Sequence, residues 1–409
     1  MAEVVFITHR IPYPPDKGDK IRSYHILEHL AARHAVHLGT FVDAAEDLRY
    51  LDALHSMCAS VCAIRLHPSL ARIGSLAAIA TGESLTERHY RSRRLRQWLR
   101  NVTATRPIAA VVGYSSGVGP YLRQRLPGTP RRIMDFVDVD SEKWRQYSQG
   151  AAWPQRAIYA REQRRLAVLE RRLVRDCDAS LFVSDAEAAF FADQVPEFHA
   201  KVIGISNGVD CGFFDPGKVP ESPYPAGPTI VFTGMMDYRA NVDGVTWFAD
   251  EVFARVRAAL PATRLYIVGA RPARQVRALA ERAGIHVTGR VPDVRPYIAH
   301  ASVAIAPLKI ARGIQNKVLE ALAMNTPVVG TPQAFEGIDA FPGRSPCTAA
   351  GPDAFAQAVL RILHRPRSAD SRLREFVLER YDWDRRLAAL DGLVMGTAET
   401  PDAAFAVRA

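Results

Sequence analysis

The sequence predicts an α/β protein with two doubly wound, mostly parallel sheets. Short apolar runs alternate with amphipathic segments along most of the 409 residues, and this order is typical of strands and helices in a parallel sheet. The alternation stops at a proline-dense stretch, residues 215–228, and then restarts. Such a stretch indicates a linker between two domains. We expect the two sheets to face each other across a cleft at the carboxyl ends of their strands, where ligands usually bind.

The first half contains apolar runs that predict strands, separated by segments with helical periodicity. A loop rich in proline and glycine, residues 9–19, follows the first strand, and a helix is expected over residues 20–33. The strands are expected at residues 4–8, 35–42, 60–66, 108–112, 132–137 and 180–183.

The second half repeats this layout. A helix over residues 352–363 has Phe355, Val359, Ile362 and Leu363 on one face, so this face is expected to be buried. Strands are expected at residues 229–233, 264–268, 285–288, 302–306 and 327–330, and helices at 241–259, 272–283, 313–324 and 368–392.

These elements define the expected domain boundaries. The first domain covers residues 1–214, the linker covers 215–228 and the second domain covers 229–366. A C-terminal helix within residues 367–395 is expected to pack back on the first domain. Residues 396–409 are expected to form a flexible tail.

Composition excludes several classes of protein. Hydrophobic residues make up 48% and charged residues 23% of the chain, an ordinary globular mixture. No uncharged run is long enough for a transmembrane helix, and residues 1–6 lack the basic segment of a secretory signal. Five scattered cysteines do not form a disulfide framework or a zinc motif. We therefore expect a cytoplasmic location.

The chain is basic, with 53 Lys and Arg against 43 Asp and Glu, a net charge of +10. Two segments, residues 83–100 and 156–176, are expected to be arginine-rich helices with one apolar face. They could be solvated surface helices or a peripheral contact with anionic lipid on the inner face of the cytoplasmic membrane. No nucleic acid partner is expected, because no nucleic-acid-binding motif accompanies the charge.

Three segments have the composition to bind an anionic, nucleotide-like ligand. Each places a glycine and at least one basic residue where a strand is expected to lead into a helix: residues 16–22, 232–241 and 312–321. A helix N-terminus offers free N–H groups and a favourable dipole to phosphate. In the third segment Lys317 adds a point charge, and Glu320 follows one turn later, where its carboxylate can accept hydrogen bonds from ribose hydroxyls.

With these residues the chain resembles a retaining glycosyltransferase of family 4, with the two-domain GT-B architecture. The resemblance covers residues 4–392, and its specific parts are the opening segment 9–23, residues 206–210 and residues 317–329. The opening segment, residues 134–144 and residues 315–317 also resemble a subfamily of sugar transferases associated with PEP-CTERM/exosortase systems, which are presumed to build bacterial exopolysaccharide.

The resemblance implies a role for each candidate residue. The first domain becomes the acceptor side and the second the nucleotide-sugar donor side. Gly18 lets its loop approach the donor diphosphate, Lys317 and Arg239 neutralise that diphosphate, and Glu320 holds the ribose. Asn207 and Gly208 lie at a hinge, and the donor-binding residues are Gly18, Gly234, Arg239, Asn241, Gln315, Asn316, Lys317 and Glu320. The sequence departs from the family at Arg312, where a glutamate that contacts the donor sugar is usual.

The implied reaction is transfer of a hexosyl-type sugar, with retention of configuration, to a saccharide or polyprenyl-linked saccharide. Fixed positive charge from Lys317 supports departure of the diphosphate without a metal or other cofactor, and no metal ligands are expected. The departing phosphate can take the acceptor proton. Asp138 either orients the acceptor hydroxyl or caps the helix that follows it. A catalytically inactive scaffold and a nucleotide-sugar epimerase remain as alternatives.

Overall fold

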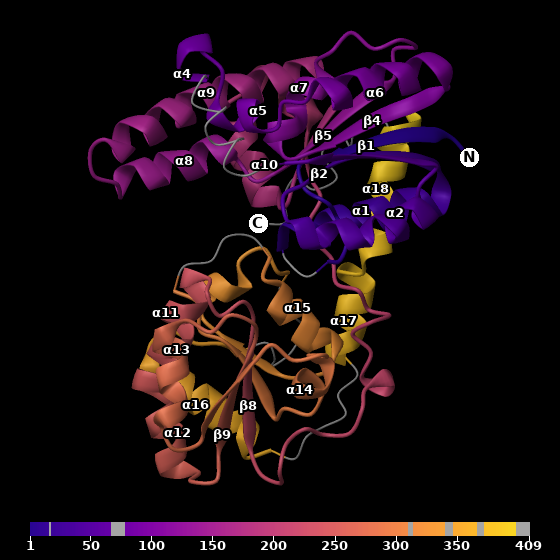
Figure 1. Cartoon of the computed structure of the whole chain (residues 1–409). Coiled ribbons are helices and arrows are strands. Elements are labelled where there is room, and N and C mark those ends of the chain that lie inside the picture. Colours follow the sequence, from indigo (N-terminus) through magenta and orange to yellow (C-terminus); the bar gives the residue numbers. More distant parts are fainter. Residues whose placement is uncertain (16–17, 67–77, 310–313, 340–346, 366–371, 398–409) are drawn as a thin grey trace. The chain divides into compact units, whose positions relative to one another are not determined.

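In a computed structural model the chain forms two compact units (Figure 1). The structure describes residues 1–15, 18–66, 78–309, 314–339, 347–365 and 372–397. One unit comprises Met1–Ser206 together with Leu387–Ala409, and the other comprises Asn207–Arg386. Each is an α/β unit with its own sheet, as the alternating pattern predicted.

The first unit has a seven-stranded sheet in the order β3-β2-β1-β4-β5-β6-β7. All of its pairings are parallel. Its central strands are almost wholly buried because helices cover both faces, which explains their continuous apolar runs. The strands are β1 (Glu3–Thr8), β2 (Ala35–Val42), β3 (Ser60–Arg65), β4 (Ile108–Tyr114), β5 (Arg131–Val137), β6 (Ala179–Phe182) and β7 (Val202–Gly204).

Helices lie on both faces of this sheet (Figure 1). One face packs against α6, α7 and α9 through a core that includes Leu95, Leu122 and Leu173. Helix α1 contacts β1 and β2 on the opposite face. The helices are α1 (Gly18–Arg33), α2 (Leu51–Met57), α4 (Ala78–Thr81), α5 (Leu85–His89), α6 (Arg93–Thr105), α7 (Gly119–Leu122), α8 (Asp140–Gln149), α9 (Gln155–Asp176) and α10 (Asp185–Ala192).

The second unit has a six-stranded sheet in the order β10-β9-β8-β11-β12-β13. Its pairings are also parallel. Two hydrophobic clusters, one on each face, include Val231 and Ile230, which are neighbours in β8 and point to opposite sides. The strands are β8 (Thr229–Thr233), β9 (Arg264–Val268), β10 (Ile285–Gly289), β11 (Val303–Ala306), β12 (Val328–Gly330) and β13 (Cys347–Thr348).

The expected helices of this unit are present, two of them with local differences, and a further short helix, Arg295–Ala299, was not expected. The helix expected over residues 241–259 begins at Arg239 and contains a π-helical segment, Phe248–Val252. The helix expected over residues 272–283 ends in a 3₁₀ turn, Leu279–Glu281. The helices are α11 (Arg239–Trp247), α12 (Phe253–Ala259), α13 (Arg274–Ala278), α14 (Arg295–Ala299), α15 (Asn316–Ala323) and α16 (Pro352–Leu363).

The single helix expected over residues 368–392 is wrong. The structure has two helices, α17 (Arg372–Arg380) and α18 (Trp383–Met395). They are separated because the carbonyl of Tyr381 accepts a hydrogen bond from the Val209 N–H, at 2.7 Å. Helix α18 passes from the second unit into the first at Leu387. There Asp391 contacts His29 of α1 at 2.9 Å.

The division between the units falls at Ser206 and Asn207, earlier than residue 214. Residues 207–214 belong to the second unit because they bind the C-terminal helices. The Arg374 guanidinium donates to the carbonyls of Cys211, at 2.9 Å, and of Phe214. Gly208 is required by close packing, since a Cβ there would lie 2.7 Å from the Tyr381 carbonyl oxygen.

The basic helix expected over residues 83–100 is also wrong, because it is two helices, α5 and α6. Ser84 caps α5 in a capping box with Glu87. Ser92 caps α6 by accepting from the Leu95 N–H at 3.3 Å, and the Ser92 N–H donates to the Tyr121 hydroxyl at 2.7 Å. Two separate N-caps within nine residues therefore interrupt the helix.

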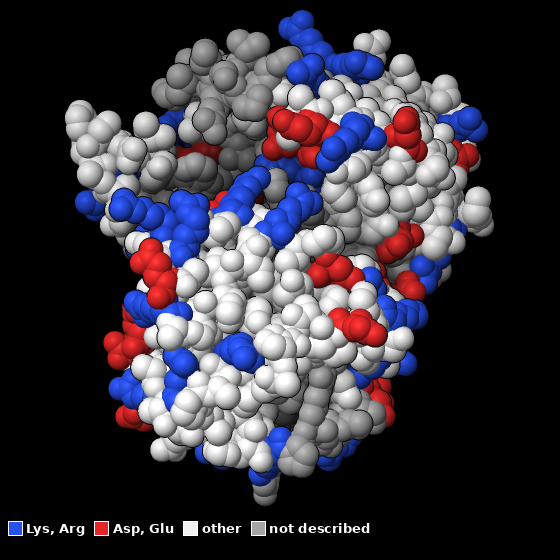
Figure 2. Space-filling model, turned by 60° about the horizontal axis from the view of Figure 1, so that its bottom comes forward, with Lys and Arg blue, Asp and Glu red and all other residues white. Residues whose placement is uncertain are grey.

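Charged side chains are present over much of the surface. Figure 2 shows Lys and Arg side chains at many places on the face in view, with Asp and Glu side chains among them. Among the described residues, no helix combines the length and the apolar character that crossing a membrane requires.

Candidate nucleotide-sugar site

The candidate site of the second unit begins where β8 ends. Gly234 follows β8 with φ of +147°, a conformation that residues other than glycine rarely adopt. A Cβ at Gly234 would lie 2.8 Å from Asn241 Nδ2 and 3.3 Å from Lys317 Nζ. The residue that follows the neighbouring strand β9, Gly269, is equally close. A Cβ at Gly269 would lie 1.7 Å from the Gly234 carbonyl oxygen. The backbone here leaves no room for a side chain.

Lys317 is the centre of this site. It lies in the first turn of α15, and its ammonium donates to Asn241 Oδ1 at 2.5 Å. Asn241 is fixed in turn because its Nδ2 donates to the Met235 carbonyl at 2.9 Å. The Lys317 ammonium also lies 4.3 Å from the centre of the Phe232 ring, which attracts a cation. Three predicted donor-binding residues, Gly234, Asn241 and Lys317, are therefore brought together.

The charges of Lys317 and Glu320 are held in a poorly solvated environment. Both side chains are half-buried and lie one turn apart on α15. Burial lowers the pKa of the Lys317 ammonium to about 7, and attraction to Glu320 opposes this shift. Burial raises the pKa of the Glu320 carboxyl to about 7, and Lys317 opposes that shift. A dianionic ligand at Lys317 would restore its charged form, because it adds a second anionic partner.

The other predicted donor-binding residues of this unit are less centrally placed. Gln315 is the N-cap residue of α15, and Asn316 is its first residue. Asn316 Oδ1 is buried without a hydrogen-bond partner among the residues described. Arg239 is not brought to Lys317: its side chain is 93% exposed and pairs with Asp243 at 3.4 Å. The departure at Arg312 lies outside the described residues.

In the first unit, Gly18 and Asp138 follow the carboxyl ends of strands, as expected. Gly18 begins α1, and a Cβ there would meet none of the described atoms within 4 Å, its chain neighbours aside. Asp138 is exposed after β5, and it is not the cap of α8, whose N-cap is Val139. Instead, Glu170 accepts from the Ser141 N–H at 2.9 Å.

A buried ion pair that sequence reasoning missed shapes the end of β5. The Arg22 guanidinium binds Asp135 at 2.9 Å, and both side chains are almost completely buried. Asp135 also accepts from the Val137 N–H at 2.9 Å. Val137 has φ of +71°, a strained conformation for a β-branched residue. Asp135 thus holds the strained backbone from which Asp138 projects.

Comparison with known proteins identifies a family that the second unit resembles. Residues 227–365, which contain the Lys317 site, match the family model described as glycosyl transferases group 1. No curated protein sequence matches the chain.

Solved structures resemble the chain over nearly its whole length. Anabaena HepE in complex with UDP and glucose is 12% identical, with 97% of this chain and 100% of HepE covered and a TM-score of 0.62. WaaG, a glycosyltransferase involved in lipopolysaccharide biosynthesis, is 18% identical, with 96% and 98% covered and a TM-score of 0.57. The trehalose 6-phosphate synthase of Burkholderia multivorans is 11% identical, with 98% and 100% covered and a TM-score of 0.61. The chain has the GT-B fold.

Proposed function

We propose that the chain is a glycosyltransferase that binds a nucleotide-sugar donor at Lys317 and transfers the sugar to a saccharide acceptor. The observation that carries the proposal is the cluster of Lys317, Asn241 and Gly234. It combines a poorly solvated cation, a glycine loop and a helix N-terminus at the carboxyl end of β8, within the segment that matches the glycosyltransferase family model. The likeness to HepE, which was solved with UDP and glucose, supports this choice of donor.

The reaction separates charge, and the cluster stabilises that charge. As the bond between the anomeric carbon and the phosphate oxygen breaks, negative charge grows on the diphosphate and positive charge grows on the sugar. Lys317 neutralises the diphosphate from a fixed position, because Asn241 and Phe232 hold its ammonium before the ligand arrives. Glu320, one turn further along α15, accepts hydrogen bonds from the ribose hydroxyls.

The acceptor oxygen forms the new bond to the anomeric carbon, and the departing phosphate takes its proton. No metal ion takes part in this scheme. In the first unit the N-terminus of α1 binds a phosphate, since a Cβ at Gly18 would meet none of the described atoms within 4 Å, its chain neighbours aside. Asp138, projecting from the strained end of β5, orients the acceptor hydroxyl.

The finer assignment follows the resemblance seen in the sequence. We place the chain in family 4, near the transferases associated with PEP-CTERM/exosortase systems, and we propose that a hexosyl-type sugar is transferred with retention of configuration. The acceptor is a growing or polyprenyl-linked saccharide of bacterial exopolysaccharide synthesis. The enzyme works in the cytoplasm, as a peripheral protein on the inner face of the membrane.

The experiment is release of nucleoside diphosphate from a panel of nucleotide-sugars, measured with and without saccharide acceptors. We expect one donor to be turned over, with the Lys317→Ala variant reduced at least about 100-fold, an effect of the size seen when a preorganised charge-stabilising group is removed. Lys218→Ala, a lysine that is 63% exposed in the same unit, is the matched control and should retain wild-type turnover. Equal turnover by Lys317→Ala and wild type would contradict the assignment of the donor site to Lys317. Conversion of the donor sugar to an isomer without diphosphate release would favour an epimerase.

A further inference from the structure

A helical hairpin of the first unit, residues 140–176, contains none of the predicted donor-binding residues. Helices α8 and α9 form the connection from β5 to β6. Figure 1 shows the pair extending away from the sheet of this unit, with a short loop at its far end. This loop and the helix ends beside it, residues 146–155, contain no Asp, Glu, Lys or Arg. We call this segment the hairpin tip.

The hairpin tip exposes large apolar side chains. Trp153 is 84% exposed and Tyr147 is 50% exposed, and Ile158, one turn into α9, is 41% exposed. Tyr147 rests against Trp144 and Tyr159, with ring centroids 5.9 and 6.3 Å away, so the base of the tip is packed. The Trp153 side chain is instead exposed to solvent. A tryptophan in this position is typical of a water–lipid interface, where its apolar ring and its N–H group are both accommodated.

The long helix behind the tip has an outer face on which the charges are basic. Sequence counting gives seven arginines and three acids over residues 156–176, but Glu162 and Glu170 are buried. Glu162 accepts from the N–H groups of Leu85 and Thr86, at 2.7 and 2.9 Å. Glu170 accepts from the Ser141 N–H. The acids of the helix interior therefore do not offset the arginines outside.

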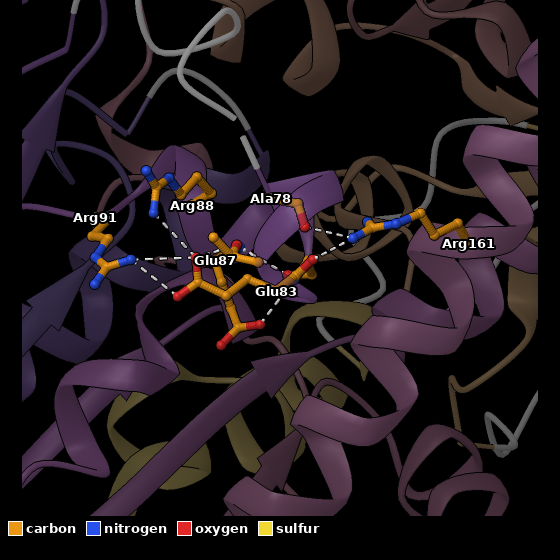
Figure 3. Close-up of polar contacts among 8 residues, drawn as sticks. Ala78, Glu83, Glu87, Arg88, Arg91 and Arg161 are labelled. Atoms are coloured by element: carbon orange, nitrogen blue, oxygen red, sulfur yellow. Dashed lines mark hydrogen bonds and ion pairs between the residues drawn. The ribbon is translucent and has the colours of Figure 1, made fainter. Parts of the chain in front are cut away.

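Not every arginine of the helix contributes to that face. Arg161 turns inward and donates to the carbonyls of Ala78, at 2.6 Å, and Glu83, at 3.1 Å (Figure 3). The Glu83 carboxylate binds Arg88 and Arg91, as the same view shows. Arg171 and Arg175 pair with Glu197 and Asp176. The exposed arginines with no ion-pair partner among the described residues are Arg156, Arg164, Arg165 and Arg172.

We propose that the hairpin tip inserts Trp153 into the interfacial region of an anionic bilayer, while the outer arginines of α9 contact the lipid headgroups. An uncharged tip with an exposed tryptophan, followed along one helix by a basic face, complements such a surface in both its apolar and its charged layers. This inference deepens the membrane location within the proposed function, and it assigns that location to one segment of the chain.

The test is sedimentation of the full chain with vesicles of phosphatidylcholine alone or mixed with phosphatidylglycerol, without donor or acceptor. We expect binding to the anionic vesicles only. Trp153→Ala should weaken it about tenfold, and Trp153→Phe should retain most of it. The double variant Arg164→Gln/Arg165→Gln should weaken binding about 25-fold, the product of about fivefold for each charge near the surface.

Matched controls distinguish binding through this surface from the general effect of losing an exposed aromatic ring or two positive charges. Phe190→Ala removes an aromatic ring that is 41% exposed on α10. Arg106→Gln/Arg125→Gln removes two exposed charges from the segments that precede β4 and β5, whereas the hairpin leaves the carboxyl end of β5. Both controls should bind as wild type does, and all of the variants should keep the melting temperature of the wild type. Equal sedimentation with neutral vesicles, or tip and arginine variants that bind like their controls, would overturn the proposal. Because no nucleotide is present, that failure would leave the proposed transfer untouched.

Discussion

The lowered pKa of Lys317 predicts that donor binding depends steeply on pH. In the free protein, burial brings this pKa to about 7. A bound diphosphate stabilises the charged form and returns the pKa toward its ordinary value, so binding above pH 7 requires uptake of a proton. Each pH unit above 7 should weaken binding about tenfold. Between pH 7 and pH 9 the dissociation constant of a nucleotide-sugar should therefore rise about 50-fold.

Titration calorimetry across this pH range, in buffers of different ionisation enthalpy, measures both the affinity and the proton uptake. Lys317→Arg keeps its charge at every pH, so its profile should be flat. Glu320→Gln removes the carboxylate that raises the Lys317 pKa, so its decline should begin below pH 7. A wild-type affinity that is constant from pH 7 to pH 9, with no proton uptake, would refute the reasoning about this lysine.

Three further predictions concern stability and metal dependence. Asp135→Ala leaves the buried Arg22 guanidinium without its carboxylate partner. The free energy of unfolding, measured in urea, should therefore fall by about 3–5 kcal/mol. A loss below about 1 kcal/mol would contradict this account of the ion pair. Gly234→Ala forces a Cβ toward Asn241 at a φ of +147°. The free energy of unfolding should fall by about 1–3 kcal/mol, and donor binding should weaken as well. An unchanged melting temperature in thermal unfolding would show that the loop relaxes freely. Saturating EDTA should leave turnover unchanged in assays of diphosphate release, and full inhibition that magnesium reverses would contradict a metal-free reaction.

The strands were predictable from sequence because burial on both faces makes them continuous apolar runs. The predicted positions of β2, β8 and β9 agree with the structure residue for residue. Strands β7 and β13 were missed, since segments of three and two residues are too short to give a period. The break between α17 and α18 was also missed, because its cause is the Val209 N–H, far away in the sequence.

The candidate site was predictable in part. Glycine loops and helix N-termini after strands are local patterns, and they located Gly234, Asn241 and Lys317 in advance. The support around them depends on contacts between distant segments. Phe232 lies beneath the Lys317 ammonium, but in the sequence it cannot be distinguished from the other apolar residues of its strand.

Buried charges were the least predictable feature. Glu162 lies in an arginine-rich helix that looks solvated throughout, yet its partners are backbone N–H groups 76 and 77 residues away. Arg22 and Asp135 are separated by 113 residues. Their pairing follows from the packing of α1 against the sheet, which no local pattern encodes.

The central claim is that a nucleotide-sugar binds at Lys317. The most direct measurement is a thermal-shift panel of UDP, GDP, ADP, CMP and their common sugar conjugates, with wild type and Lys317→Ala side by side. A ligand at about 100 times its dissociation constant stabilises the native state by about 2.7 kcal/mol, so one nucleotide series should raise the melting temperature of the wild type but not of the variant. An equal shift in both proteins, or no shift with any nucleotide, would contradict the account.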